Sequence, residues 1–146
     1  MGATIWQTQK QLGIAREQMR VELYLRLRAR FDSDKFRDAR HDLAYALQIH
    51  RPSEFIKDTV MDFFEDMGML LRRGYLDPEM VADTFSFHTL GWWHACREYI
   101  VNERHNNDDE CFYTDFEELA AKLQKNKAPS STEKSLEDEM RLTALW

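Results

Sequence analysis

One short segment, residues 72–79 with the sequence RRGYLDPE, constrains the fold more strongly than any other part of the chain. Its two arginines favour the last turn of a helix, and Gly74 suits the left-handed backbone position that follows. Asp77 suits the cap of a second helix, and Pro78 suits the first turn of that helix. The three prolines and five glycines of the chain fall mostly between stretches of helical periodicity. The sequence therefore predicts an all-α fold, a single helical bundle of about five helices with a long N-terminal helix.

The predicted helices form one domain, which we expect to span residues 1–127. A chain of 146 residues, 43% of them hydrophobic, is long and apolar enough to bury one sizeable core. Residues 128–146 begin with an Ala-Pro-Ser-Ser-Thr linker and continue with the apolar pattern of a short amphipathic helix, so we expect a partly flexible C-terminal tail. The helices of the domain are expected at about residues 4–30, 33–49, 53–71, 78–104 and 114–123.

Local signals predict how the helices begin and which of them is central. Asp32 is the expected cap of the second helix, with Phe31 and Phe36 in the hydrophobic-staple arrangement around it. Thr114 and Glu117 have the spacing of a capping box at the start of the fifth helix. The third helix is apolar around nearly its whole circumference, so it is expected to lie at the centre of the bundle.

The first helix carries an apolar stripe that advances in four-residue steps over residues 15–31 and is extended by Leu12. The first half of this helix is much more polar than the second half. Residues 1–20 are therefore expected to project from the domain or to pair with another chain. Leu12, Met19 and Leu23 are the residues through which we expect contact with a protein partner or a second copy.

Two adjacent tryptophans, Trp92 and Trp93, lie on the fourth predicted helix. Neighbouring helical side chains point about 100° apart, so one ring can enter the core while the other reaches a partner. Trp92 fits the inward stripe of this helix. Trp93 and Arg97 are then a second candidate contact, because both residue types are enriched at interface hot spots. Core packing of both tryptophans is the alternative.

Charge is distributed unevenly along the chain. Residues 1–51 contain ten Lys and Arg against six Asp and Glu, whereas residues 52–146 contain ten basic and twenty acidic residues. A basic first helix can bind nucleic acid or an anionic membrane surface, or it can pack beside acidic helices of its own fold or of a partner. The net charge of −6 disfavours nucleic acid. The residues that would form the basic surface are Arg16, Arg20, Arg26, Arg28 and Arg30.

No catalytic or metal-binding motif is present in the sequence. His88 and His94 are six residues apart on one predicted helix, so their side chains diverge and cannot share a metal ion. His88 lies on the inward stripe, which favours a hydrogen-bonded core histidine. Asp38, His41 and Asp42 form a cluster that is typical of a solvated helix face. We therefore expect no cofactor, no metal, no small-molecule substrate and no enzymatic activity.

Three segments resemble a known bacterial family. They are residues 31–40 (FDSDKFRDAR), residues 63–78 (FFEDMGMLLRRGYLDP) and residues 113–119 (YTDFEEL), the last of which follows the helix with the two tryptophans. Over roughly residues 5–123 the chain resembles the uncharacterised family called domain of unknown function 4760. The resemblance implies a helical domain and assigns it no activity. Members often carry a membrane helix ahead of this domain, so the resemblance allows membrane attachment through a segment upstream of residue 1.

These patterns predict a non-enzymatic helical protein-interaction or regulatory domain. Two cysteines cannot form a disulfide framework, and the sequence shows neither a signal peptide nor a run of about 20 apolar residues. The expected location is therefore the bacterial cytoplasm, including the cytoplasmic side of the inner membrane. The alternative function is binding to nucleic acid or to an anionic membrane surface through the basic first helix.

Overall fold

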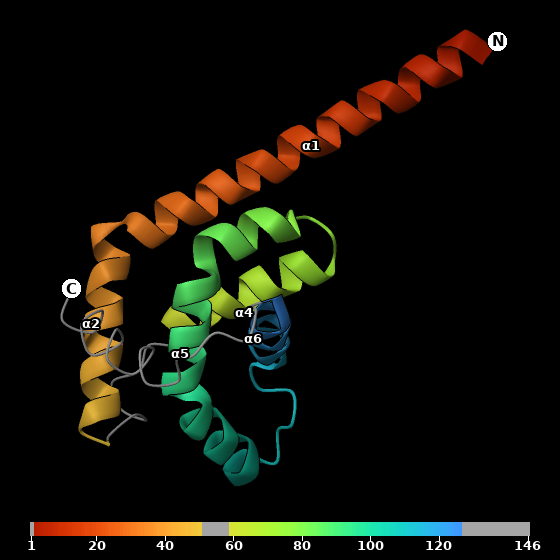
Figure 1. Cartoon of the computed structure of the whole chain (residues 1–146). Coiled ribbons are helices and arrows are strands. Elements are labelled where there is room, and N and C mark those ends of the chain that lie inside the picture. Colours follow the sequence, from red (N-terminus) through yellow and green to blue (C-terminus); the bar gives the residue numbers. More distant parts are fainter. Residues whose placement is uncertain (1, 51–58, 127–146) are drawn as a thin grey trace.

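The fold is all-α, as the sequence predicts. The computed structural model describes residues 2–50 and 59–126, and all regular structure within them is helical (Figure 1). The predicted start of the third helix and the predicted tail of residues 128–146 lie outside the described residues. The helices are α1 (Gly2–Asp32), α2 (Asp34–Gln48), α4 (Thr59–Arg72), α5 (Pro78–Asn107) and α6 (Thr114–Asn126).

Helix α4 lies at the centre of the bundle, because it buries side chains on several faces at once. Two adjacent phenylalanines, Phe63 and Phe64, are completely buried and contact different helices. The Phe64 ring stacks on Phe116 of α6 at a centroid distance of 5.0 Å. The Phe63 ring contacts one ring from each of α1, α2 and α5, namely Phe31, Phe36 and Phe85. The aromatic residues therefore join all five helices into one core.

Glycines are placed differently from the prediction. Four of the five lie inside helices, and only Gly74, with φ of 77°, occupies a turn between two helices. Gly68 lies where α4 packs closely against α6. A Cβ atom at this position would lie 2.7 Å from the Asp115 carbonyl carbon. Small size is what this position requires. The expectation that glycines mark helix boundaries is wrong here, because a glycine also permits close approach of two helices.

The start of α2 differs from the prediction by one residue. Ser33, rather than Asp32, is the N-cap, and its hydroxyl accepts a hydrogen bond of 3.3 Å from the Phe36 amide. Asp32 is the last residue of α1. With the cap at Ser33, the staple positions fall elsewhere, although the rings of Phe31 and Phe36 still touch at a centroid distance of 5.5 Å.

The first turn of α6 is stabilised by side chains of α4 rather than by a capping box of its own. Glu117 does not cap the helix, because its carboxylate binds Arg104 of α5 at 2.7 Å. Glu65 of α4 instead accepts a 2.7 Å hydrogen bond from the Phe116 amide, one of the free donors at the helix start. Arg72 of α4 donates to both carboxylate oxygens of Asp115, at 2.7 and 3.0 Å. Helix α4 thus fixes the first turn of α6.

Helix α5 begins as predicted. The Asp77 carboxylate accepts hydrogen bonds from the amides of Glu79 and Met80, at 2.8 and 3.1 Å. Leu76 and Val81, which flank this cap, are both buried, so the helix start is also held by apolar contact.

Helix α1 extends far beyond the bundle. At 1.5 Å per residue its 31 residues span about 46 Å. Residues 2–19, hereafter the arm, are exposed throughout, whereas Leu27 and Phe31 are buried at the other end (Figure 1). The arm contributes nothing to the core, and this is the most unusual feature of the fold.

Candidate interaction surface on helix α1

The three residues predicted to contact a partner do not share one environment. Leu12 and Met19 lie on the arm with exposed fractions of 55% and 42%. Leu23 is half-buried and packs against the core of the bundle. The four-residue spacing is real, but it rotates gradually around the helix, because 3.6 residues make one turn. The stripe therefore passes from solvent into the core along its length.

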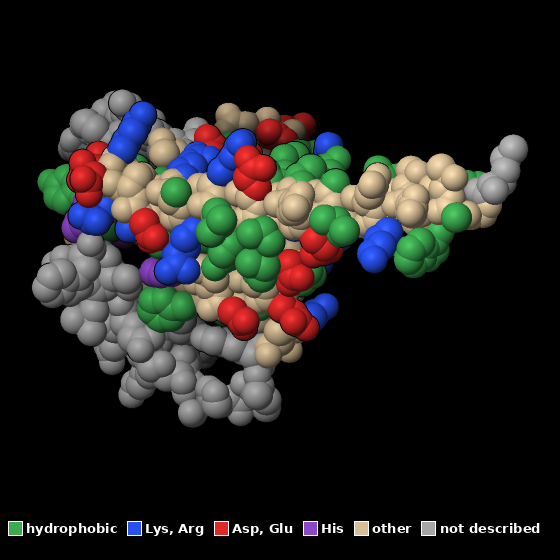
Figure 2. Space-filling view, turned by 90° about the horizontal axis from the view of Figure 1, so that it is seen from above, with side chains coloured by type: hydrophobic (Ala, Val, Ile, Leu, Met, Phe, Trp, Pro, Cys, Tyr) green, Lys and Arg blue, Asp and Glu red, His purple; other side chains and the backbone are tan. Residues whose placement is uncertain are grey.

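The exposed apolar residues of α1 form two stripes on different faces. The arm stripe consists of Ile5, Leu12 and Met19, which follow one another at seven-residue steps. The outer stripe consists of Ile14, Val21 and Leu25. At 100° per residue the two stripes are separated by about 160° around the helix. Figure 2, which looks onto the face that α1 crosses, shows hydrophobic side chains exposed between acidic and basic ones along this helix.

The outer stripe was not predicted from the sequence. Its members recur after seven and then four residues, which is the spacing of one helix face. The longer series of four-residue steps over residues 15–31 indicates a different apolar face of α1, and it obscures this second pattern. Helix α1 therefore has two apolar faces, and a single stripe accounts for only one of them.

Polar contacts fix the orientation of α1 on the bundle. The hydroxyl groups of Tyr24 and Thr84 are 2.7 Å apart, which joins α1 to α5. Arg20 donates to the Gly74 carbonyl at 3.3 Å, and Arg30 lies 3.5 Å from the Asp66 carboxylate of α4. Together with buried Leu27, these contacts hold one face of α1 on the bundle and leave the outer stripe exposed.

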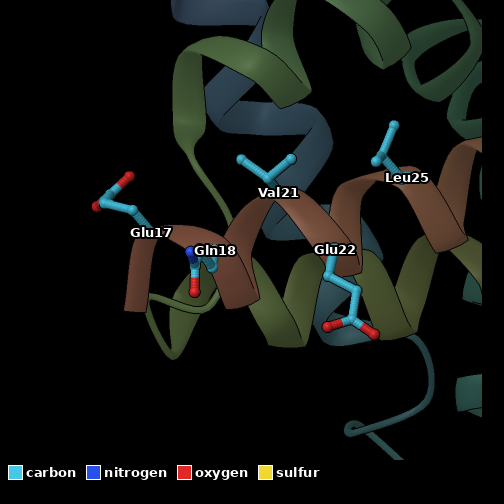
Figure 3. A pocket seen from close by; sticks show the side chains of 5 residues that line it. All are labelled: Glu17, Gln18, Val21, Glu22 and Leu25. Atoms are coloured by element: carbon cyan, nitrogen blue, oxygen red, sulfur yellow. The ribbon is translucent and has the colours of Figure 1, made fainter. Parts of the chain in front are cut away.

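A shallow depression follows the outer stripe. Its lining residues all belong to α1: Glu17, Gln18, Val21, Glu22 and Leu25 (Figure 3). No other helix contributes a wall, so the depression has no opposing surface with which to enclose a small molecule.

The basic residues of α1 are largely engaged with neighbouring acids. Four of the five arginines that would form a basic surface make ion pairs, and Arg16 lies exposed on the arm. Three of these pairs lie within α1 and one reaches α4. The pairs are Arg20–Glu17 at 3.0 Å, Arg26–Glu22 at 2.6 Å, Arg28–Asp32 at 3.3 Å and Arg30–Asp66 at 3.5 Å.

The two tryptophans do not divide into one core residue and one exposed residue. Trp92 and Trp93 are both half-buried and both pack against the core. The Trp93 ring meets Phe116 of α6 edge-on, at a centroid distance of 5.3 Å. Arg97 is exposed on the following turn of α5. Trp93 is thus a packing residue between α5 and α6 in this structure.

Comparison with known protein families shows to which family the chain belongs. Residues 3–123 match the family described as Domain of unknown function (DUF4760). The chain belongs to this family. No curated protein and no solved structure matches the chain. Membership in DUF4760 therefore brings no activity, ligand or partner with it.

The remaining reactive groups of this DUF4760 domain are dispersed. Within residues 2–50 and 59–126, no three His, Cys, Asp or Glu side chains are placed to hold a metal ion. His88 lies against the Phe31 ring at 4.6 Å, and its pKa is lowered chiefly by burial and further by the nearby Arg40. Burial raises the pKa of the Cys96 thiol to about 12. Cys111 is exposed on the turn before α6.

The same described residues contain no helix that is long and apolar enough to cross a membrane. In the arm, charged and amide side chains such as Gln7, Lys10 and Glu17 interrupt the apolar ones.

Proposed function

We propose that this protein is a non-enzymatic interaction or regulatory domain whose helix α1 binds another protein chain. The observation that carries the proposal is the arm, in which every residue from 2 to 19 is exposed. Most of the stability of a helix in a protein comes from tertiary packing of one face, and the arm has no such packing. A binding partner that covers the arm would supply the missing packing.

The chemistry of the arm supports a protein partner. The arm stripe offers Ile5, Leu12 and Met19 along one face, which is the pattern of a helix that enters a groove or pairs with another helix. Trp6 is also exposed, and Lys10 lies over its ring at 5.3 Å from the centroid. Tryptophan is among the residues that most often dominate protein interfaces.

Binding to nucleic acid or to an anionic membrane surface is less well supported. Phosphate contacts require free cationic side chains, whereas four of the five candidate arginines face acids. A helix that lies on a membrane needs one apolar face and one polar face. The two opposed apolar stripes of α1 do not meet that requirement, but they suit a helix with protein on two sides.

The cysteines are compatible with the cytoplasmic location that we propose. Both Cys96 and Cys111 are free thiols, one buried and one exposed. Free thiols of this kind persist in reducing compartments. We place the domain in the bacterial cytoplasm, including the cytoplasmic side of the inner membrane.

The proposal is tested with the full chain and a variant in which Leu12 and Met19 are both replaced by lysine. A matched control carries lysines at Gln9 and Gln11, so that it adds the same charge to the arm. Circular dichroism should show that both variants keep the fold, since all four side chains are exposed. Affinity capture from bacterial lysate, with and without nuclease, then compares the proteins that the wild type and the two variants bind.

We expect the Leu12→Lys, Met19→Lys variant to lose partner proteins that the wild type and the control capture. Nuclease treatment should leave the association intact, and added salt should change it little. If both variants associate like the wild type, the arm stripe is not the binding element. If association disappears with nuclease and weakens steeply with salt, the nucleic-acid alternative replaces the proposal.

A further inference from the structure

The outer stripe has the spacing of a coiled-coil seam. Ile14, Gln18, Val21 and Leu25 follow one another at steps of four, three and four residues, as core positions of a heptad do. The three apolar members have exposed fractions of 51%, 44% and 56%. This spacing places all four side chains along one line of the helix.

The depression beside this seam has the form of a coiled-coil hole. In knobs-into-holes packing, a side chain of one helix inserts among four residues of the facing helix. Residues at positions i, i+3, i+4 and i+7 are neighbours on the surface of a helix, and Gln18, Val21, Glu22 and Leu25 have this spacing. Figure 3 shows Val21 and Leu25 side by side on one edge, with Gln18 and Glu22 along the other.

We infer that the outer stripe binds a second copy of this chain, with the two α1 helices antiparallel and related by a two-fold axis between Met19 and Arg20. The inference rests on the proposed function in one respect, that α1 is the associating helix. It adds the identity of one partner, the face that is used and the direction of packing.

The seam is complementary to itself in this register. An axis between residues 19 and 20 places Ile14 opposite Leu25 of the second copy, and Leu25 opposite Ile14 of the second copy. Gln18 and Val21 face each other in the two central layers. All three apolar residues of the stripe are then covered in each chain, and the amide of Gln18 helps to specify one register.

Charges on the two sides of the seam distinguish antiparallel from parallel packing. In a parallel pair, Glu17 would face Glu22 of the second copy on both sides, and the two Arg28 side chains would meet in one layer. Such like-charge contacts are unfavourable. In the antiparallel register, Glu17 faces Tyr24 of the second copy and Glu22 faces Ala15 of the second copy. The only close cationic approach is that of Lys10 to Arg28 of the second copy, which is already paired with Asp32.

The arrangement is also sterically open. The contacts of Tyr24, Leu27 and Arg30 hold a different face of α1 on the bundle. The arm stripe lies about 160° from the outer stripe, so it remains available when the two copies pair. A dimer and a separate partner on the arm can therefore coexist.

Disulfide trapping tests the partner and the direction together. The exposed Cys111 is first replaced by serine, and single cysteines are then introduced as Ile14→Cys and Leu25→Cys in two preparations of different mass. Buried Cys96 is retained. In the proposed register residue 14 faces residue 25 of the second copy, whereas the two residues 14 lie about 16 Å apart along the helix axis.

We expect the mixture of the two preparations to form a cross-linked species of intermediate mass, and each preparation alone to form little. Faster cross-linking of each cysteine variant with itself would overturn the antiparallel arrangement. Absence of cross-linking in all three samples, together with a monomer mass by sedimentation at every concentration tested, would overturn the second copy as the partner.

A second measurement separates this inference from the proposed function. Sedimentation equilibrium compares a Val21→Lys, Leu25→Lys variant with the Leu12→Lys, Met19→Lys variant. The first should become monomeric and the second should keep the mass of two chains. If only the arm variant loses the dimer, the outer stripe is not the seam, while helix-mediated association stands. If the wild type is monomeric but arm-dependent capture of another protein persists, the inference fails and the proposed function survives.

Discussion

The arm of α1 and the central helix α4 are both helical, but they are stabilised in different ways. Helix α4 buries six of its fourteen residues and touches four other helices through two phenylalanines. The arm buries none of its residues, and its local support consists of contacts such as Thr8 Oγ1 to the Thr4 carbonyl at 2.8 Å. Helicity alone therefore does not show which part of a fold is structural. Burial separates the scaffold of this protein from the surface that we propose to bind a partner.

The largest expected effect comes from removing a central ring. Replacing Phe63 with alanine should lower the free energy of unfolding by about 3–5 kcal/mol, because it leaves a cavity where rings from α1, α2 and α5 meet. Leu12→Ala on the arm should change it by less than about 0.5 kcal/mol. Urea unfolding monitored by circular dichroism compares the two. Equal losses would mean that the arm is part of the cooperative core.

The next largest effect concerns two glycines in helices. Gly68→Ala should cost about 2–3 kcal/mol, since the added methyl group would press against the backbone of Asp115 and separate α4 from α6. Gly13→Ala meets no atom within 4 Å and should favour the arm helix by about 0.5–1 kcal/mol. Thermal unfolding reports the first change. Hydrogen exchange of arm amides reports the second.

The test is that the two substitutions change helix stability in opposite directions. A stabilising Gly68→Ala would show that α4 and α6 are not in close contact at this position. A Gly13→Ala variant with weaker protection of the arm would show that a neighbouring chain already occupies the space beside Gly13.

A smaller effect is expected for ion pairs. Arg104 is largely buried, and it donates to the Phe112 carbonyl at 2.8 Å and to Glu117 at 2.7 Å. Arg104→Met should lower the free energy of unfolding by about 1–2 kcal/mol, because the carbonyl loses its donor. Arg26→Met removes an exposed pair with Glu22 and should cost about 0.3 kcal/mol. Chemical denaturation in low and high salt resolves the difference, and salt should weaken only the exposed pair appreciably.

How much the sequence could predict depends on how local each signal is. The start of α5 was predicted correctly because Asp77, Pro78 and their staple partners lie within six residues of one another. The start of α6 at Thr114 was also predicted, but its capping was predicted wrongly, because the carboxylate that accepts from the Phe116 amide belongs to Glu65, 51 residues away. No local pattern distinguishes a Glu117 that caps its own helix from one that binds Arg104.

On the candidate interaction surface, too, local patterns predicted local features and missed contacts between distant residues. Composition and spacing were sufficient to predict that the first half of α1 projects from the bundle, whereas binding of a partner by Leu12 and Met19 stays a prediction. They could not place Leu23 in the core, or Trp93 against Phe116, because those outcomes depend on the angle at which α1 and α6 cross the bundle. The outer stripe was visible in the spacing, but its exposure depended on which face of α1 the bundle covers.

The smallest expected effect lies where the buried end of α1 meets the bundle, at the contact of His88 of α5 with Phe31 of α1. Burial, together with Arg40 and Arg28, lowers the pKa of His88, and Asp32 opposes this only in part. The unfolded chain therefore binds the proton more readily than the folded chain, so stability should fall as the pH drops through the ordinary histidine range. His88→Gln should reduce this dependence, and His41→Gln, on an exposed face of α2, is the matched control substitution. Thermal midpoints measured at neutral and mildly acidic pH compare the three proteins. An unaltered pH dependence in His88→Gln would mean that protonation does not weaken this junction, and that α1 is held there by Phe31 and Leu27 whatever the charge of the imidazole.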